Sequence, residues 1–155
     1  MMDYITAKWL HVLSSAVLFG TGIGTAFYMF FATLDREPRV VYVVAKHVVI
    51  ADWLFTTPSV LIQPITGFYL IYLAGFSLTS RWIVWSIALY LLAGACWLPV
   101  VWMQIRMREL ARCAAENSNE LPPLYWRYFR VWILLGIPAF LGLVVVFYLM
   151  VAKPV

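Results

Sequence analysis

Four long apolar stretches alternate with short polar segments along this chain. The apolar stretches run at roughly 4–34, 44–75, 82–105 and 126–151. Each can cross a bilayer as a helix, which takes about 20 residues. Only helices or closed barrels satisfy their backbone in lipid, and runs of this length without alternation are not barrel strands. The pattern therefore predicts an all-α polytopic membrane protein, a four-transmembrane-helix bundle that forms a single membrane domain over 1–155.

The polar segment at about 106–125 is the one loop of appreciable size. Its first part, RMRELARCAAE, is expected to extend the third helix beyond the membrane, and Pro122 and Pro123 end that extension because proline cannot continue a helix. The second, third and fourth helices contain internal prolines, each of which removes a backbone hydrogen bond. We expect these three helices to be kinked and to enclose a cavity.

Composition and charge support a membrane protein. The chain is 65% hydrophobic and 12% charged, whereas soluble domains are about half apolar and about a quarter charged. Eight of the eleven Lys and Arg residues fall on the side of the first and third loops. Because cytoplasmic loops are rich in Lys and Arg, both termini are expected outside the cytoplasm. No soluble basic face remains for a nucleic acid. The expected partner is the lipid bilayer, and a homo-oligomer or a larger membrane complex stays open.

A polar stripe runs along one face of the second helix. At about 100° per residue its members lie within about 40° of Asp52, and they are Asp52, Thr56, Ser59, Gln63 and Thr66. His47 falls on another side. A carboxylate in lipid costs a few kcal/mol, so Asp52 must be paired, hydrated or protonated. Two interpretations are open, an ion pair with Arg127 or Arg130 and a role in handling protons or a solute.

The first and third helices carry thinner polar faces, with His11 and Ser15 on the first and Ser86 and Tyr90 on the third. We expect these residues and the stripe on the second helix to line the cavity. Ser and Thr in membrane helices often bond only the preceding turn or a neighbouring helix. Packing alone is therefore the competing interpretation of the hydroxyl groups.

The two histidines raise the question of haem b, which small helical membrane proteins bind through histidine. In an antiparallel hairpin the depths of His11 and His47 differ by about 24 Å, so they cannot ligate one iron. His11 alone could be an axial haem ligand, a metal ligand, a proton-handling group or a histidine hydrogen-bonded between helices. No cluster of metal ligands, nucleophile–base pair or phosphate loop appears, so the sequence does not decide whether the protein is an enzyme.

Several phrases resemble the bacterial family known as domain of unknown function 2269. They are KWLHVLSSAVLFGTGIGTAFY, ADWLFTTPSVLIQPITGFYLI, LPPLYWRYFRVWILLGIPAF and FYLMVAKP. The resemblance covers essentially the whole chain and implies a four-helix integral protein of the bacterial inner membrane. With the charge pattern, it implies periplasmic termini.

A more distant similarity is to the HemJ type of protoporphyrinogen oxidase and to copper-resistance D membrane domains, through a first-helix histidine matched by His11. The HemJ type depends on a lysine early in its third membrane helix, where this chain reads SRWIVWSIALY with Arg81. The resemblance therefore implies haem binding through His11 but no oxidase activity. The functional alternatives are redox or tetrapyrrole-related chemistry, a small carrier or channel component for protons, metal or a small polar solute, and a non-catalytic accessory subunit.

Overall fold

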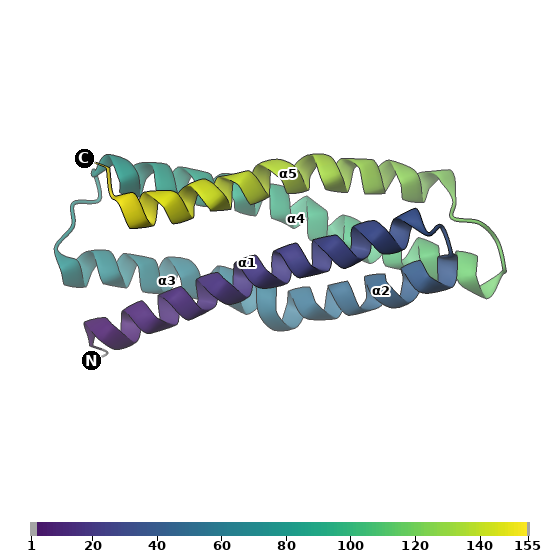
Figure 1. Ribbon diagram of the computed structural model, residues 1–155, viewed down its shortest axis with the longest axis horizontal. Coiled ribbons are helices and arrows are strands. Elements are labelled where there is room, and N and C mark those ends of the chain that lie inside the picture. The colour runs from purple at the N-terminus through teal and green to yellow at the C-terminus, as the bar shows by residue number, and fades with distance from the viewer. Residues whose placement is uncertain (1–2, 155) are drawn as a thin grey trace.

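The computed structural model describes residues 3–154 and consists of long helices that lie side by side (Figure 1). The first is α1 (Tyr4–Leu34), and the second is divided into α2 (Pro38–Ala51), a π-helical turn η1 (Asp52–Thr56) and α3 (Thr57–Ala74). They are followed by α4 (Arg81–Glu116) and α5 (Pro123–Ala152). Four helices, counting α2 to α3 as one, are long and apolar enough to cross a membrane. The predicted all-α four-helix membrane bundle is confirmed.

Helix ends follow local capping chemistry. Asp3 caps α1 by accepting a hydrogen bond from the Thr6 amide at 3.2 Å, and its hydrogen bonds with Thr6 hold the pKa of Asp3 below the ordinary value. α2 begins at Pro38, six residues before the predicted start, because proline suits the first turn of a helix. α4 continues to Glu116, which confirms the predicted helical extension beyond the apolar span.

The π-helical turn lies directly before Pro58. In a regular α-helix the ring of Pro58 would meet the carbonyl of Leu54, four residues earlier. Here the backbone hydrogen bond spans five residues instead of four, and the amide of Thr57 donates to the carbonyl of Asp52. The hydroxyl of Thr57 donates to the same carbonyl. Pro64, Pro99 and Pro138 lie inside helices that continue through them. The change of helix type among the described residues is thus confined to the turn that begins at Asp52.

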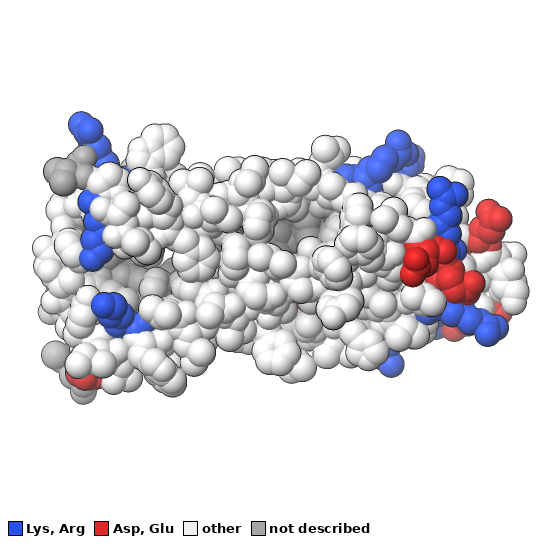
Figure 2. Space-filling model, in the orientation of Figure 1, with Lys and Arg blue, Asp and Glu red and all other residues white. Residues whose placement is uncertain are grey.

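Charged side chains gather at the two ends of the bundle, and one end carries more of them than the other (Figure 2). Both termini and the α3–α4 turn lie at one end, called here the terminal end, and the α1–α2 and α4–α5 turns lie at the other, called the basic end (Figure 1). The surface between the ends is almost free of charged side chains in this view (Figure 2). This band is what a lipid-facing surface requires.

The apolar core occupies the half of the bundle toward the basic end. It draws on α1, α2, α4 and α5, and its fully buried members include Met29, Val41, Met107 and Tyr125. α5 packs mainly on α4, α4 also packs on α2, and α1 packs on both α2 and α3. The half toward the terminal end has no comparable apolar cluster within residues 3–154. That half holds the polar side chains between α1 and α3.

Candidate functional site: a polar cluster between α1 and α3

Gln63 of α3 is the centre of a hydrogen-bonded cluster with α1. Its Nε2 lies 2.6 Å from Oγ of Ser14 and 2.8 Å from Oγ of Ser15. Both hydroxyls donate in turn to the carbonyl of His11, at 3.1 and 2.7 Å. The two amide hydrogens and the two hydroxyl hydrogens therefore have acceptors, and the cluster is internally satisfied. It ties α1 to α3 through polar groups in a part of the bundle that lipid surrounds.

His11 joins the same cluster through its ring. Its Nδ1 lies 2.8 Å from Oγ1 of Thr66, and that hydroxyl lies 2.8 Å from the carbonyl of Ile62. We expect the Thr66 hydroxyl to donate to the Ile62 carbonyl, which can only accept, so that His11 Nδ1–H donates to Thr66. The neutral imidazole then has an unprotonated Nε2. This nitrogen has no hydrogen-bond partner among the described residues, so it is the ring atom that can accept a proton or bind a ligand.

Gly67 provides the space for this ring. A Cβ atom at Gly67 would lie 3.3 Å from Cε1 of His11 and 3.9 Å from Nδ1. The first distance is shorter than an ordinary van der Waals contact, so a side chain here would push the imidazole away from Thr66. The sequence ITG in α3 therefore supplies both the acceptor and the gap for His11.

A small cavity adjoins His11 between α1, α3, α4 and α5. Its volume is about 40 Å³. The polar residues on it are His11, Ser15, Gln63 and Tyr90, and apolar residues of α5, including Phe147 and Met150, close the other side. Tyr90 donates from its hydroxyl to the carbonyl of Val60 at 2.6 Å, which joins α4 to α3. The cavity has room for water, which takes about 30 Å³ per molecule in the liquid.

The polar stripe of the second helix is buried along its whole length. Asp52, Thr56, Ser59, Gln63 and Thr66 are each 4 to 9% exposed, while His47 is exposed. Oδ1 of Asp52 accepts a hydrogen bond from the hydroxyl of Thr56 at 2.9 Å. Its Oδ2 is buried without a partner. The prediction that Asp52 faces inward is confirmed, and so is the separation of His47 from the stripe.

The ion pair considered for Asp52 does not form. The ion pairs within residues 3–154 join Arg108 and Arg112 to Glu109 and Glu116. Arg127 and Arg130 are exposed, and Arg130 Nε donates to the Trp126 carbonyl at 3.4 Å. The physical reason is depth. Asp52 lies fourteen residues into the second helix, about 21 Å, whereas Arg130 lies seven residues into α5, about 10 Å.

Ser14 was missed by the sequence prediction, and Gln104 was placed on a polar face without being assigned to the site. Ser14 lies about 60° from His11 on the wheel, outside the expected face, yet it is buried and bonds Gln63. Gln104 of α4 is 5% exposed, and its Oε1 is buried without a hydrogen-bond partner. On the helical wheel Gln104 shares a face with Ser86 and Tyr90, which was the signal in the sequence. Ser86, which was predicted to line the cavity, is buried but donates only to the Trp82 carbonyl of its own helix, at 2.7 Å.

The cavity beside His11 is far smaller than the pockets that organic cofactors such as haem b occupy. Pockets that hold organic ligands measure roughly 300–1,000 Å³, against about 40 Å³ here. Residues 3–154 also contain no group of three His, Cys, Asp or Glu side chains placed to hold a metal ion. Haem ligation by His11 stays a prediction that this geometry does not favour.

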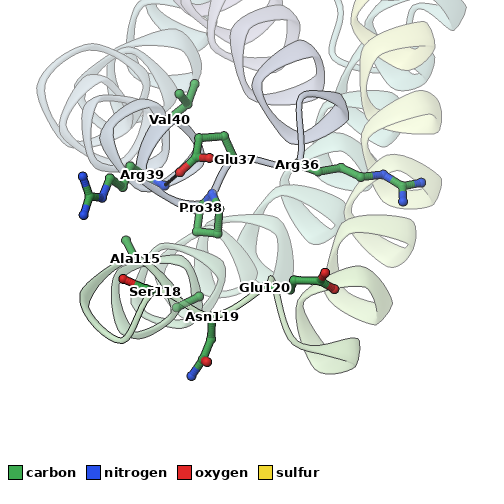
Figure 3. Close-up of a pocket in the computed structure, with 10 residues that line it drawn as sticks. Arg36, Glu37, Pro38, Arg39, Val40, Ala115, Ser118, Asn119 and Glu120 are labelled. Atoms are coloured by element: carbon green, nitrogen blue, oxygen red, sulfur yellow. Dashed lines mark hydrogen bonds between the residues drawn. The ribbon is translucent and has the colours of Figure 1, made fainter.

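A larger hollow lies far from these polar groups, at the basic end between the α1–α2 and α4–α5 turns, and measures about 740 Å³. Arg36 and Arg39 belong to its lining, but their side chains point away from each other (Figure 3). Arg36 instead stacks over the Trp126 ring, 5.5 Å from its centroid. The hollow is an open cleft between turns, without converging polar groups.

Comparison with known protein families gives one assignment. Residues 5–154 match the family described as "Predicted integral membrane protein (DUF2269)". Neither the curated proteins nor the solved structures contain a match to the chain. The match covers nearly the whole sequence and agrees with the four membrane-spanning helices. The chain therefore belongs to the DUF2269 family of predicted integral membrane proteins.

Proposed function

We propose that this protein moves protons within the membrane along the polar stripe of the second helix, with Asp52 as the central proton carrier and His11 as the outer proton-accepting group. The observation that carries the proposal is the state of Asp52. It is 4% exposed, forms no ion pair within residues 3–154, and keeps one oxygen without a partner. A buried carboxyl in a membrane helix without a counter-ion is typical of proton relays.

The stripe supplies groups that can exchange protons at short intervals. From Asp52 the polar positions continue through Thr56, Ser59 and Gln63 to Thr66, a rise of about 21 Å. Thr66 contacts the ring of His11, and the cavity beside His11 has room for water. Hydroxyl groups and water both donate and accept hydrogen bonds, so each can pass a proton on.

The orientation follows from charge. Eight of the eleven Lys and Arg residues lie toward the basic end. An excess of Lys and Arg is typical of cytoplasmic loops, which supports a cytoplasmic basic end and periplasmic termini in a bacterial cell. His11 then lies near the periplasmic side and Asp52 near the middle of the inner membrane.

The competing functions are less well supported by the geometry. A carrier for a larger solute needs a bigger cavity than about 40 Å³. Redox or tetrapyrrole chemistry at His11 would also need a larger cavity, to hold the cofactor or substrate. An accessory subunit needs only helix packing, which explains the hydroxyls and Gln63 but not a buried acid that lacks a counter-ion.

Proteoliposomes test the proposal. A potassium diffusion potential is imposed with valinomycin, and an internal dye reports pH. We expect proton uptake by the wild-type protein, a loss of at least tenfold in Asp52→Asn, and a reduced rate in His11→Ala. Asp35→Asn is the matched control, since Asp35 is an exposed carboxylate in the α1–α2 turn. Equal flux in empty liposomes and in liposomes with wild-type protein would refute the proposal and favour the accessory role.

A further inference from the structure

Three arginine side chains gather around Trp126 where α5 begins, at the basic end of the bundle. The guanidinium of Arg36, in the α1–α2 turn, stacks over the Trp126 ring with 5.5 Å between its Cζ and the ring centroid. Nε of Arg130 donates to the carbonyl of Trp126 at 3.4 Å. At about 100° per residue, Arg127 lies about 60° from Arg130 on the same face of α5. Positive charge from a turn and from a helix therefore meets around one tryptophan.

These arginines have no acidic partner within residues 3–154. The ion pairs of that part of the chain all lie near the end of α4. Three acids of the adjacent turns take no part in them, namely Asp35, Glu37 and Glu120. Stacking on Trp126 uses the flat face of the Arg36 guanidinium and leaves the N–H groups at its edge for an acceptor. The cluster thus offers charge and hydrogen-bond donors to an anion that the chain itself does not supply.

The backbone of Arg36 is a second, independent observation. Its φ is +58°, in the left-handed region, where residues other than Gly, Asn and Asp are uncommon. An arginine here carries backbone strain that a glycine would avoid, and such strain points to a use for the side chain. That side chain extends to the α5 side of the turn (Figure 3).

The depth of the cluster matches the phosphate groups of a lipid leaflet. Residues 131–151 of α5 are an uncharged run of 21 residues, and about 20 helical residues cross the hydrocarbon of a bilayer. Arg127 and Arg130 directly precede this run and are exposed, so they lie at its boundary. Tryptophan is enriched at the same level. A soluble phosphate would have room in the open cleft of about 740 Å³, but Arg36 extends toward α5 rather than into that cleft (Figure 3).

We propose that Arg36, Arg127 and Arg130 bind the phosphate of an anionic phospholipid beside Trp126. Guanidinium groups bind phosphate through paired N–H donors, and basic sites between membrane helices on the cytoplasmic side take anionic headgroups. The acyl chains of the lipid then lie along the uncharged run of α5. Bound in this way, the lipid bridges the α1–α2 turn and the start of α5.

Native mass spectrometry of the full chain, released from detergent micelles, tests the proposal by resolving single lipid-binding events. Phosphatidylglycerol and phosphatidylcholine are titrated separately, and the Kd of the first bound lipid is measured. We expect the wild-type protein to bind phosphatidylglycerol more tightly. Arg36→Gln and Arg130→Gln should each raise its Kd by about fivefold. Arg39→Gln is the matched control, because Arg39 is exposed at the same end and its side chain points away from Arg36 (Figure 3).

Three results would overturn the proposal. The first is an equal Kd for the two lipids in the wild type. The second is an equal rise of the Kd in Arg39→Gln, which would show general surface charge in place of a site. The third is displacement of phosphatidylglycerol by glycerol phosphate beyond the effect of salt at matched ionic strength, which would assign the arginines to a soluble phosphate. If Arg36→Gln does not fold, Arg127→Gln and Arg130→Gln test the same site from α5.

Discussion

Nδ1 of His11 and Oγ1 of Thr66 lie 2.8 Å apart, and this contact determines which nitrogen of the imidazole carries the proton. We expect the Thr66 hydroxyl to donate to the carbonyl of Ile62, so that the ring donates from Nδ1. The contact also joins α1 to α3 over a separation of 55 residues in the chain. One threonine thereby sets both the tautomer of His11 and the position of its helix.

Replacement of Thr66 by valine should change the tautomer of His11. The variant keeps the shape of the side chain but leaves Nδ1–H without its acceptor, so the neutral ring should redistribute its proton toward Nε2. Nitrogen-15 NMR of labelled histidine measures this, and a buried donor left unpaired should also lower the unfolding free energy by about 1–3 kcal/mol. Thr66→Ser retains the hydroxyl and should behave like the wild type. A valine variant with unchanged nitrogen shifts would disprove the assigned tautomer.

The side chains of Gln63 and Ser14 should contribute to the unfolding free energy as a coupled pair. Gln63→Leu removes the amide donor and Ser14→Ala removes one of its acceptors, so the loss in the double variant should be smaller than the sum of the single losses. For residues in one hydrogen-bond network, coupling of about 0.5–3 kcal/mol is usual. Unfolding in mixed micelles with increasing denaturing detergent gives the four free energies. Additive losses would show that the amide and the hydroxyl do not stabilise the α1–α3 contact together.

The sequence could predict the fold because hydrophobic length alone defines membrane helices. The first helix begins and ends at the predicted residues, and the stripe from Asp52 to Thr66 is buried as the wheel required. The extension of α4 to Glu116 was also readable from its composition. These features depend on the order of apolar and polar residues within one helix, and a single sequence is enough to show that order.

Contacts between helices could not be read in the same way. The charges alone suggested an ion pair of Asp52 with Arg127 or Arg130. Whether it can form depends on how deep each side chain lies in the membrane, which is decided by where α2 and α5 begin. The roles of Ser14 and Gln104 depend on the rotation of α1 and α4 against the second helix. That rotation is set by packing of side chains such as Phe19, which stacks on Phe140 with ring centroids 5.3 Å apart.

Tyr125 at the basic end should contribute to stability through one buried hydrogen bond. Its hydroxyl lies 2.8 Å from Oγ1 of Thr33, whose own proton goes to the Met29 carbonyl at 2.8 Å, so Tyr125 is the donor. Tyr125→Phe should reduce the unfolding free energy by about 1 kcal/mol, measured by thermal unfolding in detergent. Tyr148→Phe is the control, since Tyr148 is 67% exposed and should unfold as the wild type does. A larger loss in the control than in Tyr125→Phe would refute the role of this bond.

Haem should not bind through His11 while the bundle keeps this packing. Nε2 of His11 is free to act as a ligand, but the adjoining space of about 40 Å³ is far below the roughly 300 Å³ or more that organic ligands occupy. After expression with added haem precursor, the purified protein should have no Soret band that depends on His11. The spectra of wild type, His11→Ala and Gly67→Ala should therefore coincide. A Soret band that is lost in His11→Ala but kept in His47→Ala would contradict this expectation, and it would mean that α5 moves away from α1 to admit the macrocycle.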